Sequence, residues 1–100
     1  MSDQSQIAEY RDKLRAHFPE LAQRHRVKSL AFFGSRVRGE GRPDSDLDVL
    51  AHFQVTPTLF GILALENELS DLLGVHVDLV LRESLRPAVA RQVLADLVPV

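Results

Sequence analysis

The sequence has no cysteine, so it can form neither a disulfide framework nor a thiolate zinc site. It also lacks any apolar run that approaches the ~18 residues required for a membrane span. The N-terminus carries no basic segment followed by an apolar one, so we expect no signal peptide. These absences favour a protein of the reducing cytoplasm with no membrane partner.

An excess of charge of one sign is missing as well. The 12 Lys and Arg residues nearly balance the 14 Asp and Glu residues, and the net charge is −2. This balance gives no sign of direct binding to nucleic acid or to an anionic membrane. With 100 residues, 45% of them hydrophobic, the chain can bury a modest core. We therefore expect a single domain over residues 1–100, without repeats or linkers.

The hydrophobic periodicity predicts six elements in the order α-β-β-α-β-α. Helices are expected over residues 3–18, from Thr56-Pro57-Thr58 to a stop at Gly74, and from a Ser84 cap to about residue 97. Pro19 is expected to stop the first helix or to start a further turn. Strands are expected over residues 27–33, 46–53 and 75–81. The fold class is therefore α+β, with a small mixed sheet of about three strands and helices packed on one side.

A long loop from Gly34 to Ser45 separates the first two predicted strands. Long loops in compact domains are usually functional or disordered. Glycine allows the backbone to turn sharply and to approach a ligand closely, and the Ser35 hydroxyl with nearby N–H groups can hold phosphate oxygens. Taken alone, a Gly-Ser pair is more often simple turn punctuation. It is not a Walker loop, because no Gly-Lys-Ser/Thr follows at the required distance.

Three aspartates occupy positions that are unusual for strands. Asp46 and Asp48 share one face of the second predicted strand, where they repel each other unless a cation lies between them. Asp78 lies in the middle of the third strand, and it can join the same face if the two strands are neighbours. A solvated strand start and an edge strand facing water are the alternatives. One site for a hard cation such as Mg²⁺ would explain all three carboxylates.

Arginines are concentrated in the same loop at positions 36, 38 and 42. Their guanidinium groups could clamp phosphates, or they could form ion pairs with Glu40 and Asp44 in a solvated loop. Arg36 is the strongest candidate for phosphate binding because it directly follows the Gly-Ser turn.

The combined pattern resembles the nucleotidyltransferase superfamily of the DNA polymerase beta type. Gly34-Ser35, about ten further residues, Asp46-x-Asp48 and the later strand residue Asp78 carry the resemblance. The segment G-S-R-V-R-G-E-G-R-P-D-S-D-L-D-V-L is similar almost throughout to the signature loop of the minimal nucleotidyltransferase (MNT) family. The resemblance covers roughly residues 27–97 and implies a polymerase beta-like nucleotidyltransferase fold.

Members of the MNT family are antitoxins that pair with HEPN ribonuclease toxins. The resemblance therefore implies an enzyme that binds ATP together with two Mg²⁺ ions and transfers AMP to a tyrosine hydroxyl of its toxin. It also implies that the enzyme can form a hetero-oligomer with this toxin. It implies these roles: triphosphate binding by Gly34, Ser35 and Arg36; metal binding by Asp46, Asp48 and Asp78; and catalysis by the same three aspartates.

Two other functions compete with this one. The chain could be an antitoxin that acts by binding alone and has a vestigial nucleotide site. It could also transfer nucleotides to a small molecule or to RNA. The chain matches the family at every motif position, which argues against a family member that has lost its catalytic activity.

Overall fold

The computed structural model describes residues 3–42 and 44–100, and it describes residues 3 and 4 by their backbone alone. The domain was expected to span residues 1–100, and its expected start at residue 1 lies outside the described residues. The elements are α1 (Asp3–His25), β1 (Val27–Phe33), β2 (Leu47–Phe53), α2 (Leu59–Leu73), β3 (Val77–Leu81), the 3₁₀ helix η1 (Arg82–Ser84), α3 (Pro87–Asp96) and β4 (Val98–Pro99). The predicted order of helices and strands is confirmed, with η1 and β4 in addition.

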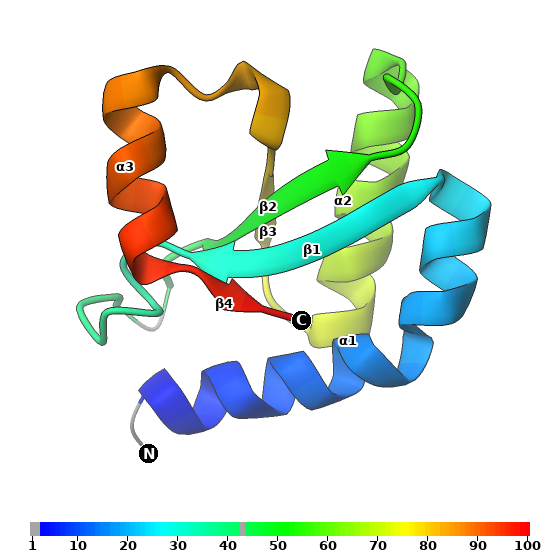
Figure 1. The fold of residues 1–100 in the computed structure, drawn as a ribbon. Helices are drawn as coiled ribbons and strands as arrows, with labels where there is room; N and C mark the ends of the chain where they lie inside the picture. The colour runs from blue at the N-terminus through cyan, green and yellow to red at the C-terminus, as the bar shows by residue number, and fades with distance from the viewer. Residues whose placement is uncertain (1–2, 43) are drawn as a thin grey trace.

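The sheet is mixed, as expected, and its strand order is β3-β2-β1-β4 (Figure 1). β1 pairs antiparallel with β2 and with β4, whereas β2 and β3 are parallel. Parallel neighbours need a crossover connection, and α2 supplies it. The expectation of about three strands missed the short edge strand β4.

The main core lies between one face of the sheet and the two helices α1 and α2. Alternation along β2 directs every second side chain into this core: Leu47, Val49, Ala51 and Phe53. α1 contributes Ile7, Leu14 and Leu21 to the same cluster. The intervening residues of β2 therefore face the other side of the sheet, and Asp48 is among them.

The third helix stands apart from the other two. α3 and α2 lie on opposite sides of the sheet (Figure 1), and α3 contacts β1. Its buried Val93 lines a pocket together with Phe33, whose side chain does not belong to the main core. Packing of helices on one side thus holds for α1 and α2, while α3 borders the polar face.

Helix ends follow the sequence signals in α2 but not elsewhere. The Thr58 hydroxyl accepts a hydrogen bond from the Gly61 N–H at 3.1 Å, and Gly74 ends α2 with φ 69°, as predicted. The predicted cap by Ser84 is wrong, because residue 84 ends η1 and α3 begins at Pro87. The predicted limit at residue 18 is also wrong, since α1 continues through Pro19 with a bend (Figure 1). No helix in the described part of the chain has the length and apolar character needed to span a membrane.

Arg26, between α1 and β1, has a left-handed backbone with φ 54°. An L-residue in this conformation costs roughly 1–2 kcal/mol relative to a right-handed one, and glycine avoids the cost. We expect Arg26→Gly to raise the free energy of unfolding by about 0.5–1 kcal/mol after the entropy lost by glycine on folding is subtracted. Urea denaturation measures the change. Arg26→Ala is the matched control: it removes the side chain but keeps the strain, so an equal gain there would contradict this explanation.

Candidate active site

The candidate site lies where the ends of three segments meet on the polar face of the sheet. Phe33, the last residue of β1, is the register partner of Asp48 in β2, and Asp48 is the register partner of Asp78 in β3. Neighbouring strands are ~4.8 Å apart, and register partners project to the same face. The structure thus brings Asp48 and Asp78 side by side, as the sequence predicted.

Gly34 is in direct contact with the Asp48 carboxylate. A Cβ atom at position 34 would stand 2.1 Å from Asp48 Oδ2, and Gly34 has φ 89°. Both observations require glycine, because any other side chain would overlap the carboxylate and strain the backbone. The glycine of the predicted Gly-Ser turn therefore makes room for the central aspartate.

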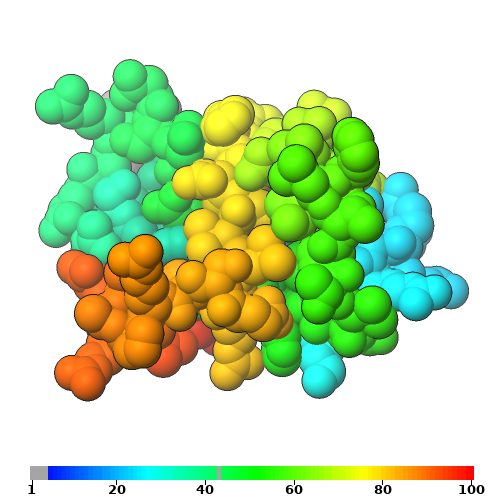
Figure 2. Space-filling view, turned by 90° about the horizontal axis from the view of Figure 1, so that it is seen from above, coloured from blue at the N-terminus to red at the C-terminus, as the bar shows by residue number. Residues whose placement is uncertain are grey.

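The loop after Gly34 folds back in a tight turn. The Gly34 carbonyl accepts a hydrogen bond from the Arg38 N–H at 3.2 Å, and the Ser35 carbonyl accepts one from the Glu40 N–H at 2.9 Å. In the view from above, this loop (blue-green) and α3 (orange) lie on one side of the β3 segment (yellow), and α2 (green) lies on the other (Figure 2). Ser35 is half-buried in this turn, and contact of its hydroxyl with a phosphate stays a prediction.

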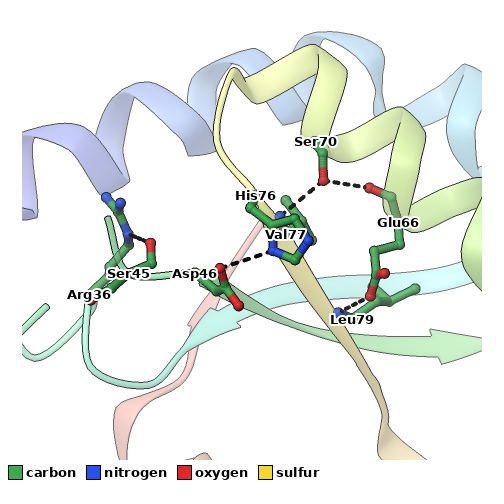
Figure 3. A network of polar contacts seen from close by, with 8 residues as sticks. All are labelled: Arg36, Ser45, Asp46, Glu66, Ser70, His76, Val77 and Leu79. Atoms are coloured by element: carbon green, nitrogen blue, oxygen red, sulfur yellow. Dashed lines mark hydrogen bonds and ion pairs between the residues drawn. The ribbon is translucent and has the colours of Figure 1, made fainter. Parts of the chain in front are cut away.

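Arg36, the strongest arginine candidate for phosphate binding, is buried and forms hydrogen bonds within the protein. Its side chain is 5% exposed, and its Nε donates to the Ser45 carbonyl at 2.7 Å (Figure 3). Its Nη1 donates to Gln6 Oε1 of α1 at 3.4 Å. Through these contacts Arg36 connects the start of the loop to its end at Ser45 and to α1. Direct contact of Arg36 with a phosphate stays a prediction.

Arg38 links the loop to α3. Its Nη1 lies 2.6 Å from Asp96 Oδ2, and its Nε lies 3.0 Å from Glu40 Oε2. The hydrogen bonds to Asp96 and Glu40 raise the pKa of Arg38. The pairing with Glu40 agrees with the ion-pair alternative for this arginine, whereas no pattern in the sequence pointed to Asp96. A pocket of about 220 Å³ opens here between Gly34, Arg38 and the side chains of α3.

Asp46 is placed just before β2, next to His76. Asp46 Oδ1 and His76 Nδ1 are 2.9 Å apart (Figure 3), and the two side chains are 51% and 70% exposed. Solvent screens so exposed a pair, and its contribution to stability is ~0–1 kcal/mol. A ligand could therefore displace His76 from Asp46 at little cost. No spacing in the sequence marked His76 as a metal ligand, and its place beside Asp46 follows from the parallel pairing of β2 with β3.

Negative charge accumulates around Asp48. Burial raises the pKa of the Asp48 carboxyl, and the charges of Asp78 and Asp46 raise it further, while Arg38 opposes the shift. The raised pKa of Asp48 thus reflects its burial first and the repulsion by Asp78 and Asp46 second, and Arg38 offsets these effects only in part. A bound cation would relieve this repulsion.

The donor set fits a divalent cation that enters with a phosphate ligand. Among residues 3–42 and 44–100, no three His, Cys, Asp or Glu side chains form a ready-made metal cluster. Mg²⁺ does not need one, because it keeps several waters and takes oxygens from one or two carboxylates and from substrate phosphates. Asp48 and Asp78 share a face, and Asp46 follows the same alternation. These carboxylates are the residues that could hold the ion.

Comparisons with known proteins identify the family. The family model described as "Nucleotidyltransferase domain" matches residues 12–100. A solved structure assigned as a minimal nucleotidyltransferase is 37% identical, with a TM-score of 0.74, and the match covers 100% of this chain and 97% of the other. This chain belongs to the minimal nucleotidyltransferase family. The resemblance that the signature loop suggested is thereby confirmed.

One curated relative of this minimal nucleotidyltransferase is the protein adenylyltransferase MntA of Thermococcus cleftensis. The two are 43% identical over 92 residues, which cover 92% of this chain and 93% of MntA. The relatives therefore match nearly the whole length on both sides.

Two toxin–antitoxin structures share the fold. One contains AMP-PNP and matches at 22% identity and a TM-score of 0.68, over 84% of this chain and 69% of the other. The other is a tri-AMPylated HEPN toxin of Shewanella oneidensis in complex with an MNT antitoxin. It matches at 18% identity and a TM-score of 0.64, over 90% of this chain and 70% of the other.

The contact between Gly34 and Asp48 can be tested with a pair of glycine variants. Gly34 and Gly39 both have positive φ, but a Cβ at Gly39 meets nothing within 4 Å. We expect Gly39→Ala to lower the free energy of unfolding by about 1–2 kcal/mol through backbone strain. Gly34→Ala should lower it by roughly 1–3 kcal/mol more, because the Asp48 carboxylate must move. Denaturant unfolding of both variants measures the difference, and equal losses would refute the contact.

The raised pKa of Asp48, caused by burial and then by the charges of Asp78 and Asp46, predicts a pH-dependent gain in stability for Asp48→Asn in metal-free buffer. At pH 7 the ionised carboxylate costs more in the folded protein than in the unfolded chain, so the variant should have the higher melting temperature. As the pH falls through the raised pKa of the folded state, Asp48 gains a proton and the difference shrinks. It should vanish below the unfolded pKa of about 3.9.

Asp44→Asn is the control for this experiment, because it removes the same charge from an exposed loop residue. Thermal unfolding from pH 3 to pH 8 compares the two variants. An Asp48→Asn protein that melts below the wild type at pH 7 would contradict the conclusion that burial and neighbouring charges destabilise the ionised Asp48 carboxylate.

Proposed function

We propose that this nucleotidyltransferase is a protein adenylyltransferase antitoxin. It transfers AMP from ATP to a tyrosine hydroxyl of a cognate HEPN ribonuclease toxin and so silences the toxin. The observation that carries the proposal is the placement of Asp48 beside both Gly34 and Asp78 on one open face of the sheet. The curated adenylyltransferase MntA, 43% identical over nearly the whole chain, supports protein as the acceptor class.

The proposed reaction is a displacement at the α-phosphorus of ATP. The tyrosine oxygen forms a bond to that phosphorus while the bond to the pyrophosphate oxygen breaks, and pyrophosphate leaves with the electron pair. Asp78, which is exposed on the reactive face, accepts the hydroxyl proton, and it would also be among the carboxylates that hold Mg²⁺. In-line attack requires a fixed triphosphate, and the roles of Gly34 and Ser35 are to bind it through the turn.

Mg²⁺, when bound to Asp46, Asp48 and Asp78, would offset the negative charge of the phosphates and of the leaving pyrophosphate. The chain's own contribution is to gather the carboxylates. Asp48 stays in place because Gly34 leaves room for it, and Arg36 holds the loop closed through the Ser45 carbonyl. Two ions are proposed on the basis of the family resemblance.

The proposed partner is a toxin with a HEPN domain, and the proposed assembly is a hetero-oligomer. The fold is shared with a chain in a complex of a tri-AMPylated HEPN toxin with an MNT antitoxin, which supports this partner class. ATP as the nucleotide is supported by a toxin–antitoxin structure of the same fold that contains AMP-PNP. Consumption of ATP agrees with the cytoplasmic location expected from the absence of cysteine.

Intact-mass spectrometry of the toxin tests the proposal directly. The protein is incubated with ATP, Mg²⁺ and the HEPN-domain protein encoded next to it. We expect the toxin to gain mass in steps of one AMP and to lose RNase activity in parallel. The double variant Asp46→Ala/Asp48→Ala should lower the rate at least about 100-fold, because it removes the carboxylates that hold the ion. EDTA should abolish transfer by the wild type.

The matched control is Asp44→Ala, which removes an exposed carboxylate from the same loop and should keep nearly the full rate. Inhibition of the toxin without a gain in mass, unchanged in the double variant, would refute transfer and establish an antitoxin that acts by binding. Transfer of AMP to RNA or to a small molecule with no modified toxin would refute the protein acceptor.

A further inference from the structure

Two side chains of α2 bind the outer edge of β3. Ser70 Oγ accepts a hydrogen bond from the Val77 N–H at 3.0 Å, and Glu66 Oε2 accepts one from the Leu79 N–H at 2.8 Å (Figure 3). Ser70 Oγ also donates to the Glu66 carbonyl at 2.9 Å, which fixes the hydroxyl on the helix. β3 is the terminal strand of the sheet, so these two N–H groups have no neighbouring strand to pair with.

The position of Glu66 is unusual for a charged residue. It lies on the apolar stripe of α2, between the fully buried Leu65 and Leu69. A carboxylate near a core needs a hydrogen-bond partner to offset the loss of water. The Leu79 N–H is such a partner, and a bond to a charged acceptor is stronger than one between neutral groups.

Asp78 lies between Val77 and Leu79, the two residues whose N–H groups bind α2. Val77 and Leu79 point into the core, whereas Asp78 points to the open face, where its side chain is exposed. Packing therefore fixes its neighbours but not its own side chain. The backbone of Asp78 is held by the parallel ladder with β2 on one side and by the α2 bonds to its two neighbours on the other.

We propose that Glu66 and Ser70 are positioning residues that hold Asp78 at its place beside Asp48. This inference rests on the proposed function, in which Asp78 acts on the attacking hydroxyl. A displacement of reacting groups by ~1 Å can cost on the order of 100-fold in rate. Loosening the edge of β3 should therefore lower kcat while leaving the binding of ATP, through the turn at Gly34 and Ser35, nearly unchanged.

Three variants and one control test the proposal in the full-length protein. Glu66→Ala and Ser70→Ala each remove an acceptor, Glu66→Gln keeps one, and Asn67→Ala changes an exposed neighbour on the same helix. The first readout is amide hydrogen exchange by NMR in the free protein. We expect exchange at Leu79 in Glu66→Ala, and at Val77 in Ser70→Ala, to be roughly tenfold faster than in the wild type.

The second readout is steady-state AMP transfer to the toxin. We expect about a tenfold loss of kcat in Glu66→Ala with less than about a twofold change in KM for ATP. Glu66→Gln should recover kcat to within about threefold of the wild type, and Asn67→Ala should match the wild type. Should Glu66→Ala fail to fold, Ser70→Ala makes the same comparison at Val77.

Several outcomes would overturn the proposal. They are a wild-type kcat in both alanine variants, a rise in KM with kcat unchanged, no recovery in Glu66→Gln, or an equal loss in Asn67→Ala. A wild type that transfers no AMP refutes the proposed function instead. The positioning role of Glu66 and Ser70 is then tested by amide hydrogen exchange and by a crystal structure of Glu66→Ala. If Asp78 keeps its place beside Asp48 in that structure, the positioning role is refuted.

Discussion

The close approach of Gly34 to the Asp48 carboxylate is the constraint on which the rest of the site depends. The antiparallel pairing of β1 with β2 ends at Phe33 and Asp48, so the next residue of the chain must pass beside that carboxylate. Only a residue without a side chain fits, since a Cβ there would stand 2.1 Å from Oδ2. The left-handed φ of Gly34 then turns the chain into the loop that Arg36 closes by its bond to the Ser45 carbonyl.

Within the single strand β2, some residues stabilise the fold and others destabilise it in favour of the site. Leu47 and Val49 of β2 are fully buried against α1 and α2, and they hold the strand rigidly in the sheet. Asp48 between them faces the other side, where burial and the charge of Asp78 raise its pKa. The apolar face thus offsets the repulsion that the polar face creates. A site for a cation and a triphosphate needs this excess of negative charge near open solvent.

The parts of this structure that could be predicted from sequence are those with a short-range signal. The alternation in β2 fixed which residues face the core, and Gly34 to Asp48 lie close enough in sequence to form one recognisable motif. The strand β4 could not be foreseen, because two residues ending in proline have no periodicity. The continuation of α1 past Pro19 depends on packing of Leu21 in the core, which overrides the local helix-breaking preference.

The pairing of Asp48 with Asp78 shows where a sequence motif ends and tertiary structure takes over. Asp78 follows Asp48 by 30 positions, with the whole of α2 between them, and the parallel register of β2 with β3 aligns the two aspartates. An edge strand has a ladder on one side alone, so its position is less determined than that of a central strand. The connecting helix removes this freedom, because the Glu66 carboxylate occupies the edge that a further strand would fill. In a sheet this small, the crossover that creates the parallel pair also has to secure its outer member.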